Sequence, residues 1–174
     1  MIFNMQMGFI LLEVGVSRKK HSRNVLLKNV FDTLVCIFGF WFIGYGLSIN
    51  AQGGIMGNIF EFNQENEKDY YIRWLIAFSF CNTSSTIVSG CVAERMHNDT
   101  YLVYSLLIVC FVYPVCSSWV WGGGWLSLLK YHDFAGSGCI HMIGGFAGLI
   151  HTLMLGPRLG FSKKFDNSKF NYGK

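Results

Sequence analysis

The chain has 174 residues and a formal net charge of +4, with 52% hydrophobic and only 14% charged residues. Soluble domains are about one-quarter charged, and long apolar runs with so few charges cannot all be buried in a core of this size. The composition excludes an ordinary soluble domain and indicates a multi-pass integral membrane protein in a lipid bilayer. A nucleic-acid partner is also excluded, because the basic residues lie in connecting segments and form no basic aromatic surface.

Five apolar segments predict the membrane-spanning helices of an all-α protein, near residues 1–16, 30–49, 74–92, 101–121 and 139–155. The first is short, since about 20 residues are needed to cross a bilayer. Gly39, Gly44 and Gly46 in the second span predict close approach of neighbouring helices. Gly144 and Gly148 give the fifth span a GxxxG packing face.

The segments between the spans are polar. Residues 17–28 are basic, and residues 51–71 are rich in glycine, asparagine and acids, which is typical of an exposed loop. Pro114 predicts a kink inside the fourth span. We expect residues 1–160 to form one transmembrane domain and residues 161–174 to form a tail.

The distribution of basic residues predicts the orientation. Five basic residues lie in the first connector, one in the third and five in the tail, against three in the connectors on the opposite side. Because connectors rich in Lys and Arg stay in the cytoplasm, we expect the N-terminus outside and the C-terminus inside. An odd number of spans with this asymmetry resembles one half of a transporter built from inverted repeats.

Four residues are candidates for a binding site. Trp121 is either an interfacial anchor or an indole face for a cation, and Asp133 either caps the following helix or attracts a cation. His141 lies inside an apolar segment, where an ionisable group is costly and tends to be functional, although it could also be a core histidine. Phe80 is either core packing or a ring that narrows a pore.

Other polar residues indicate packing and not chemistry. The third span contains Asn82 and a run of serines and threonines, which lipid tolerates only if that face is turned into a bundle or a cavity. Asp32 suits a hydrogen-bonding role between helices. The five histidines lack the spacing of paired metal ligands, and no nucleophile stands beside a base. We therefore expect no metal, no cofactor and no enzymatic activity.

The ordered series of motifs resembles one family, the ammonium transporters of the Amt type, which are related to Rhesus proteins. The motifs are MQMGFILLEVG, NVLLKNVFD, STIVSGCVAER, WVWGGGW, HDFAGSGCIHMIGG and LGPRLG. The resemblance implies the fold of the first inverted repeat, with five of the family's eleven or so spans. It also implies a homotrimer in an intact transporter, a location in the plasma membrane, and a missing C-terminal half or matching chain as partner.

The resemblance further implies roles for the four candidates. Trp121 corresponds to the tryptophan of the outer vestibule that meets the cation, and Phe80 to one ring of the phenylalanine gate. Asp133 corresponds to the acid beside the vestibule, and His141 to the first of two pore histidines. The implied function is transport of ammonium or ammonia through an apolar pore lined by histidine. The alternative is a transport-inactive structural or regulatory membrane subunit derived from such a transporter.

Overall fold

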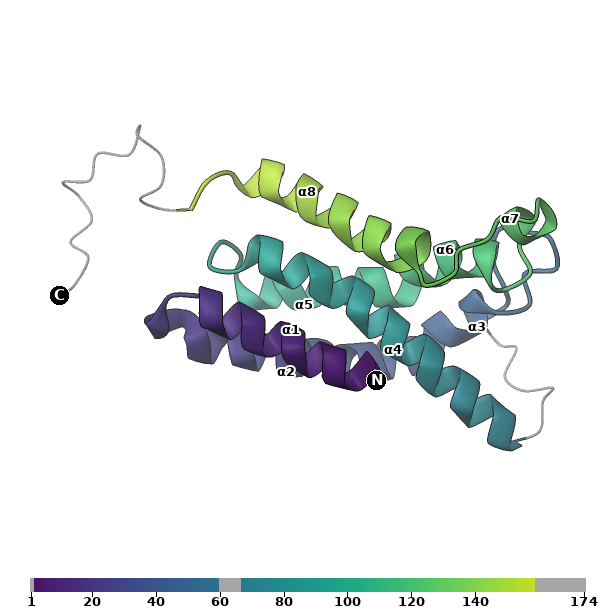
Figure 1. The fold of residues 1–174 in the computed structure, drawn as a ribbon, viewed down its shortest axis with the longest axis horizontal. Helices are drawn as coiled ribbons and strands as arrows, with labels where there is room; N and C mark the ends of the chain where they lie inside the picture. Colours follow the sequence, from purple (N-terminus) through teal and green to yellow (C-terminus); the bar gives the residue numbers. More distant parts are fainter. Residues whose placement is uncertain (1, 60–66, 159–174) are drawn as a thin grey trace.

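The computed structural model describes residues 2–59 and 67–158, and all regular structure in that part of the chain is helical (Figure 1). In chain order the elements are α1 (Ile2–Val16), η1 (Lys19–His21), α2 (Ser22–Gly39), η2 (Phe40–Gly44), α3 (Tyr45–Ser48), α4 (Glu67–Val92), α5 (Asn98–Leu107), η3 (Ile108–Val112), α6 (Tyr113–Val120), α7 (Trp125–Leu128), η4 (Ser137–Met142) and α8 (Ile143–Leu155). Short π-helical turns join α2 to α3, join α5 to α6, and precede α8.

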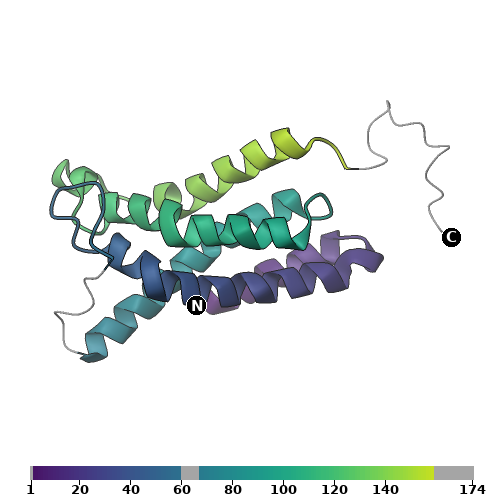
Figure 2. The ribbon, with the colours of Figure 1, turned by 180° about the vertical axis from the view of Figure 1, so that it is seen from behind.

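Four helical segments are long and apolar enough to cross a membrane, and a fifth apolar helix is shorter. The four are Lys19–Ser48, Asp69–Val92, Asn98–Leu128 and Ser137–Leu155, and the shorter one is Asn4–Val16. The predicted all-α membrane fold with five apolar helices is confirmed. Figures 1 and 2 show α1 paired with α2 on one side of the bundle, α8 on the opposite side, and α4 crossing between them.

Two predicted helix boundaries are wrong. The basic connector expected over residues 17–28 is shorter, because η1 begins at Lys19 and α2 at Ser22. α4 begins at Glu67, inside the loop expected over residues 51–71. Lys, Arg and Glu are good helix formers, so these helices extend beyond their apolar runs. Residues 60–66 of that loop and the predicted tail lie outside the described residues.

α4 is the central helix of the bundle, and its polar side chains face other helices. The buried share of its most apolar stretch is 61%, against 22% for the segment that contains α8. Its polar run from Asn82 to Thr86 is entirely buried. The sequence predicted that this face is turned into a bundle or into a cavity. In the structure it is turned into the bundle.

Asp32 is the centre of the buried polar network that joins these helices. Its side chain is fully buried on α2. Ser85 Oγ on α4 donates to Asp32 Oδ1 at 2.8 Å, and Thr86 Oγ1 donates to Oδ2 at 3.1 Å. Ser105 Oγ on α5 donates to Oδ1, and Gln6 Nε2 on α1 donates to Thr86 Oγ1. Four helices thus share one network, and the hydrogen-bonding role expected for Asp32 is confirmed.

Glycines mark the places where the helices approach most closely. A Cβ added at Gly44 would lie 2.6 Å from Val109 O in the fourth span. A Cβ added at Gly148 would lie 2.7 Å from Cys91 Sγ on α4. The close packing predicted for these two positions is confirmed. Gly46 instead approaches a loop, since its Cβ would lie 2.7 Å from Ile59 O.

Pro114 is the second residue of α6, directly after the π-helical turn η3. Proline has no N–H and clashes with the preceding turn of an α-helix. The structure has a π-helical turn directly before α6, and the helical segment Asn98–Leu128 continues through it.

Candidate functional site

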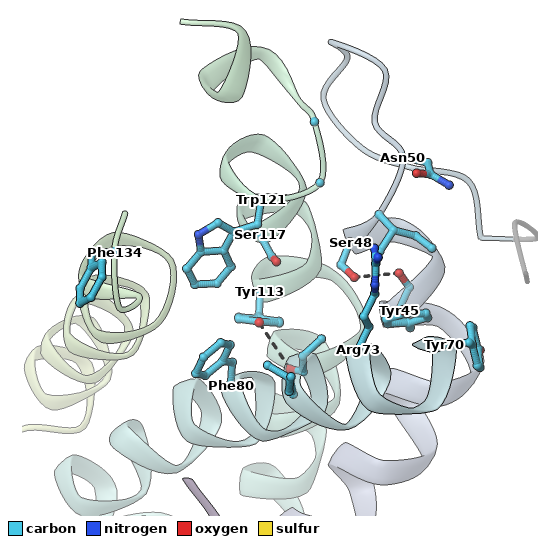
Figure 3. Close-up of a pocket in the computed structure, with 15 residues that line it drawn as sticks. Tyr45, Ser48, Asn50, Tyr70, Arg73, Phe80, Tyr113, Ser117, Trp121 and Phe134 are labelled. Atoms are coloured by element: carbon cyan, nitrogen blue, oxygen red, sulfur yellow. Dashed lines mark hydrogen bonds between the residues drawn. The ribbon is translucent and has the colours of Figure 1, made fainter. Parts of the chain in front are cut away.

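An open pocket of about 870 Å³ lies at one end of the bundle, where α3, α4 and α6 meet (Figure 3). The lining residues are mostly aromatic or apolar, with a few polar groups: Tyr45, Ser48, Ile49, Asn50, Tyr70, Arg73, Ile76, Ala77, Phe80, Tyr113, Ser117, Trp121, Gly122, Gly123 and Phe134. An apolar cavity with a few polar groups that converge on it is typical of a small-molecule site.

Two of the predicted site residues meet in this pocket. The ring centroids of Phe80 and Trp121 are 5.6 Å apart, with 33° between the ring planes. Figure 3 shows the two rings in the same part of the pocket, with the Tyr113 ring of α6 beside them and Phe134 opposite them. Trp121 is 40% exposed and Phe134 is fully exposed. Aromatic faces are therefore accessible to a ligand that enters here.

The backbone around Trp121 is fixed by the glycine turn that follows α6. Trp121 N donates to Ser117 O at 2.8 Å, which ends the helix. Gly122 O then accepts from Ala51 N at 2.8 Å, and Gly123 adopts a φ of +76°, a conformation that favours glycine. A Cβ at Gly122 would lie 2.3 Å from Ser48 O. Only glycine fits this contact, which holds the loop after α3 against Trp121.

Asp133 caps the helical segment formed by η4 and α8. Asp133 Oδ1 accepts from the backbone N–H groups of Gly136 at 2.8 Å and Ser137 at 2.9 Å. Oδ2 accepts from the N–H groups of Gly138 at 2.8 Å and Cys139 at 3.0 Å. The capping role expected for Asp133 is confirmed.

These hydrogen bonds keep the Asp133 carboxylate ionised. Burial of Asp133 raises the pKa of the carboxyl, but the backbone N–H groups of Cys139, Gly138 and Gly136 and the hydroxyl of Ser137 outweigh that effect, so the pKa lies below its usual value. The carboxylate does not belong to the pocket lining. Its two oxygens bind the backbone N–H groups at the start of the helix instead.

Asp133 also connects the tryptophan to the histidine-bearing helix. Trp121 Nε1 donates to Asp133 O at 3.1 Å, so the indole is held by the backbone of the residue that caps η4. His141 lies in η4, five residues after Gly136, whose carbonyl accepts from His141 N at 3.0 Å. One residue therefore sets the positions of both Trp121 and the helix that carries His141.

His141 lies outside the pocket on the exposed side of its helix. The same side of the segment exposes the large apolar residues Met142, Phe146, Leu149, Ile150, Leu153 and Met154. The other histidine of α8, His151, contacts Ala147 O through Nδ1 at 2.7 Å and packs against Tyr104. The two histidines of this segment thus have different surroundings, since His141 is exposed and His151 is half-buried.

The sequence interpretation missed Arg73, Tyr45 and Tyr70 as lining residues. They come from α3 and the start of α4, far in sequence from the tryptophan motif. Arg73 directly precedes the predicted third span and is one of the three basic residues on the side predicted to be outside. Its spacing of seven residues from Phe80 on one helix was the available signal, because such residues share a helix face.

Comparison with known proteins identifies the family. Residues 1–173 match the model of the Ammonium Transporter Family. A putative ammonium transporter of Synechocystis is 40% identical over 98% of this chain and 40% of its own length. Ammonium transporter Amt2 of Archaeoglobus fulgidus is 38% identical over 96% of this chain and 38% of its own.

Solved structures share the fold. The structure titled Sensor Amt Protein superposes with a TM-score of 0.84 and 31% identity, covering 90% of this chain and 42% of that chain. Mep2 of Candida albicans superposes with a TM-score of 0.77 and 28% identity, covering 90% of this chain and 37% of that one. The chain spans about 40% of the length of these two curated relatives. By its sequence and by its fold, the chain belongs to the ammonium transporter family.

Proposed function

We propose that this chain supplies one half of a path for ammonium across a membrane, and that the pocket beside Trp121 and Phe80 receives the cation. The observation that carries the proposal is the pair of aromatic rings, 5.6 Å apart, in an open pocket of a chain from this family. The names of the relatives, which include ammonium transporters, support the substrate.

The aromatic rings allow the pocket to select a cation that can lose its hydration. A cation that leaves water loses its hydration, and the face of an indole or phenyl ring compensates through its quadrupole, by about 2 kcal/mol or more at a desolvated site. Trp121 meets the cation at the mouth of the pocket, and Phe80 narrows the way beyond it. Asp133 acts as a positioning residue, because its carbonyl orients the indole while its carboxylate holds the helix start.

His141 continues the path on the next helix. A charge is costly in an apolar channel, so ammonia crosses this section as the neutral molecule while the proton moves separately. The exposed apolar face around His141 is the side on which the second half of the transporter packs and encloses the channel. The intact assembly is a homotrimer in the plasma membrane, with the N-terminus outside and the C-terminus inside.

The proposal is tested by measuring the binding of labelled methylammonium to the chain in lipid nanodiscs. Two preparations are compared, the chain alone and the chain co-expressed with the C-terminal half of a relative. The labelled methylammonium should bind saturably, with one molecule per chain, and unlabelled ammonium should displace it. His141→Ala should leave this binding unchanged within twofold, because the histidine lies beyond the pocket. Binding that fails to saturate in both preparations, although the chain is folded and inserted, contradicts the proposal.

A further inference from the structure

A buried lysine lies outside the pocket, in another part of the bundle. Lys28 on α2 is only 7% exposed and does not line the pocket. Figures 1 and 2 show α1, α2, the end of α4 and the start of α5 together at the end of the bundle opposite α7. A charge is costly inside a membrane-spanning bundle, so an ionisable group buried there tends to have a function. The proposed path for ammonium does not use this lysine.

The ammonium group of Lys28 contacts a carbonyl and an aromatic ring. Lys28 Nζ donates to Ser89 O at 3.1 Å and lies 4.9 Å from the centroid of the Tyr101 ring. Ser89 is in the last turn of α4, where the helix dipole favours a cation. A ring face within about 6 Å attracts a cation through its quadrupole. Ser89 and Tyr101 are both fully buried, so these two contacts are shielded from water.

Two carboxylates compensate the charge of Lys28. Glu13 on α1 and Asp32 on α2 both interact with it electrostatically. Glu13 Oε1 accepts from Ser89 Oγ at 2.6 Å, so it is bound to the same residue that accepts from Lys28. Glu13 Oε2 accepts from Asn29 Nδ2. Buried charges are stable when opposite charges and hydrogen bonds surround them. Side chains and backbone from four helices therefore form a site that suits a positive charge.

The geometry points to a second cation site in this chain, one that recognises a primary ammonium group and that Lys28 occupies as a tethered ligand. An ammonium group is a compact charge with three donors, and its single alkyl chain follows the buried stem of the lysine. In the wild type the lysine keeps free small amines out of this site and away from the Asp32 network. The inference does not rest on the proposed function, because the residues of this site do not line the pocket of Trp121.

Shortening the lysine should open the site to a free amine. Lys28→Ala removes the side chain from Cγ to Nζ, a fragment with the size of propylammonium. In detergent at pH 7 and constant ionic strength, propylammonium should raise the melting temperature of this variant saturably, because it binds the folded state. The half-saturation concentration should fall about fourfold for each methylene added between methylammonium and propylammonium. It should rise again for butylammonium, which is longer than the removed fragment.

The wild type, two further variants and a neutral compound provide the controls. Any shift of the wild type arises at another site and is subtracted. Lys28→Met removes the charge but fills most of the same space, so its shift should equal that of the wild type. Lys20→Ala removes an exposed lysine of η1 and should also match the wild type. Propan-1-ol has the shape of propylammonium without the charge, so at least about tenfold more of it should be needed for the same shift of Lys28→Ala.

Three results overturn the inference. Equal potency of propan-1-ol and propylammonium on Lys28→Ala would show an apolar cavity and not a cation site. Equal shifts of Lys28→Ala and the wild type would place amine binding elsewhere. If Lys28→Ala folds poorly, it is purified with and without propylammonium, and gel filtration measures the folded fraction. The same folded fraction in both preparations contradicts the inference as well.

Discussion

Trp121 depends on partners from three separate segments. Its backbone ends α6, its indole donates to Asp133 O, and its ring lies against Phe80 on α4. The motif WVWGGGW and the HDFAGSG segment identify Trp121 and Asp133 from sequence, and the capping role of Asp133 follows from its place before a helix. That the two residues touch, and that Arg73 joins their pocket, depends on long-range packing that no local pattern encodes.

Replacing the indole measures what its face contributes to binding. Trp121→Leu keeps an apolar side chain but removes the quadrupole, so the half-saturation concentration for methylammonium should rise by up to about 30-fold, equivalent to about 2 kcal/mol. Trp121→Phe is the matched control, since it keeps an aromatic face, and should lose less. Equal losses in both variants would show that the aromatic face is not what binds.

The cap at Asp133 predicts a defined response to acid. Because the folded-state pKa of Asp133 lies below its unfolded value, the cap contributes stability that is fully present above about pH 4 and is lost as the pH falls through the lowered folded-state pKa. Asp133→Asn should reduce this acid-dependent loss and cost about 1 kcal/mol at neutral pH. Tryptophan fluorescence during acid titration is the measurement.

Asp99→Asn is the control for that titration. Asp99 lies in the first turn of α5, where the N-cap residue makes no side-chain cap hydrogen bond. Its removal should leave the acid transition in place. An acid transition identical in the wild type and Asp133→Asn would contradict the role assigned to the cap.

Helix packing was predictable where it rests on small residues. Gly144 and Gly148 indicated a packing face from their spacing, and the structure places that face on α4, with a Gly144 Cβ position 2.8 Å from Ile87 Cβ. The ends of α2 and α4 were not predictable from hydropathy, because charged residues with good helix propensity extend both helices beyond their apolar cores.

The contact between α4 and α8 can be tested with two glycines of the same helix. Gly148→Val inserts carbon atoms where a Cβ already lies 2.7 Å from Cys91 Sγ, so it should destabilise the fold by about 1–3 kcal/mol. Gly145→Val adds the same atoms where nothing lies within 4 Å. Thermal unfolding in detergent should separate the two, and equal melting temperatures would contradict the packing.

At the scale of the whole molecule, α8 lies at the edge of the bundle, where it packs on α4 and leaves its other face uncovered. Its outward face exposes Phe146, Leu153 and Met154 by 60%, 73% and 81%. Hydropathy cannot distinguish a face that meets lipid from one that meets another helix, because both are apolar. The sequence therefore predicted the apolar spans but could not tell which side of them meets a partner.

A photo-crosslinking residue at Phe146 can identify what covers this face. With the C-terminal half of a relative co-expressed, p-benzoylphenylalanine at Phe146 should form a covalent adduct with that half. Phe42, which is 63% exposed on η2, is the matched control and should crosslink mainly to lipid. Adducts of equal yield at both positions would show that α8 has no preferred role in the assembly.

The central claim is that the pocket of Trp121 and Phe80 receives ammonium for passage across the membrane. Uptake of labelled methylammonium by transport-deficient cells that express the chain together with a matching second half tests it most directly. The account predicts saturable uptake that ammonium inhibits and that His141→Ala impairs or alters. Correct insertion of both halves with no uptake above the level of empty cells would contradict it, and would favour a transport-inactive structural or regulatory subunit.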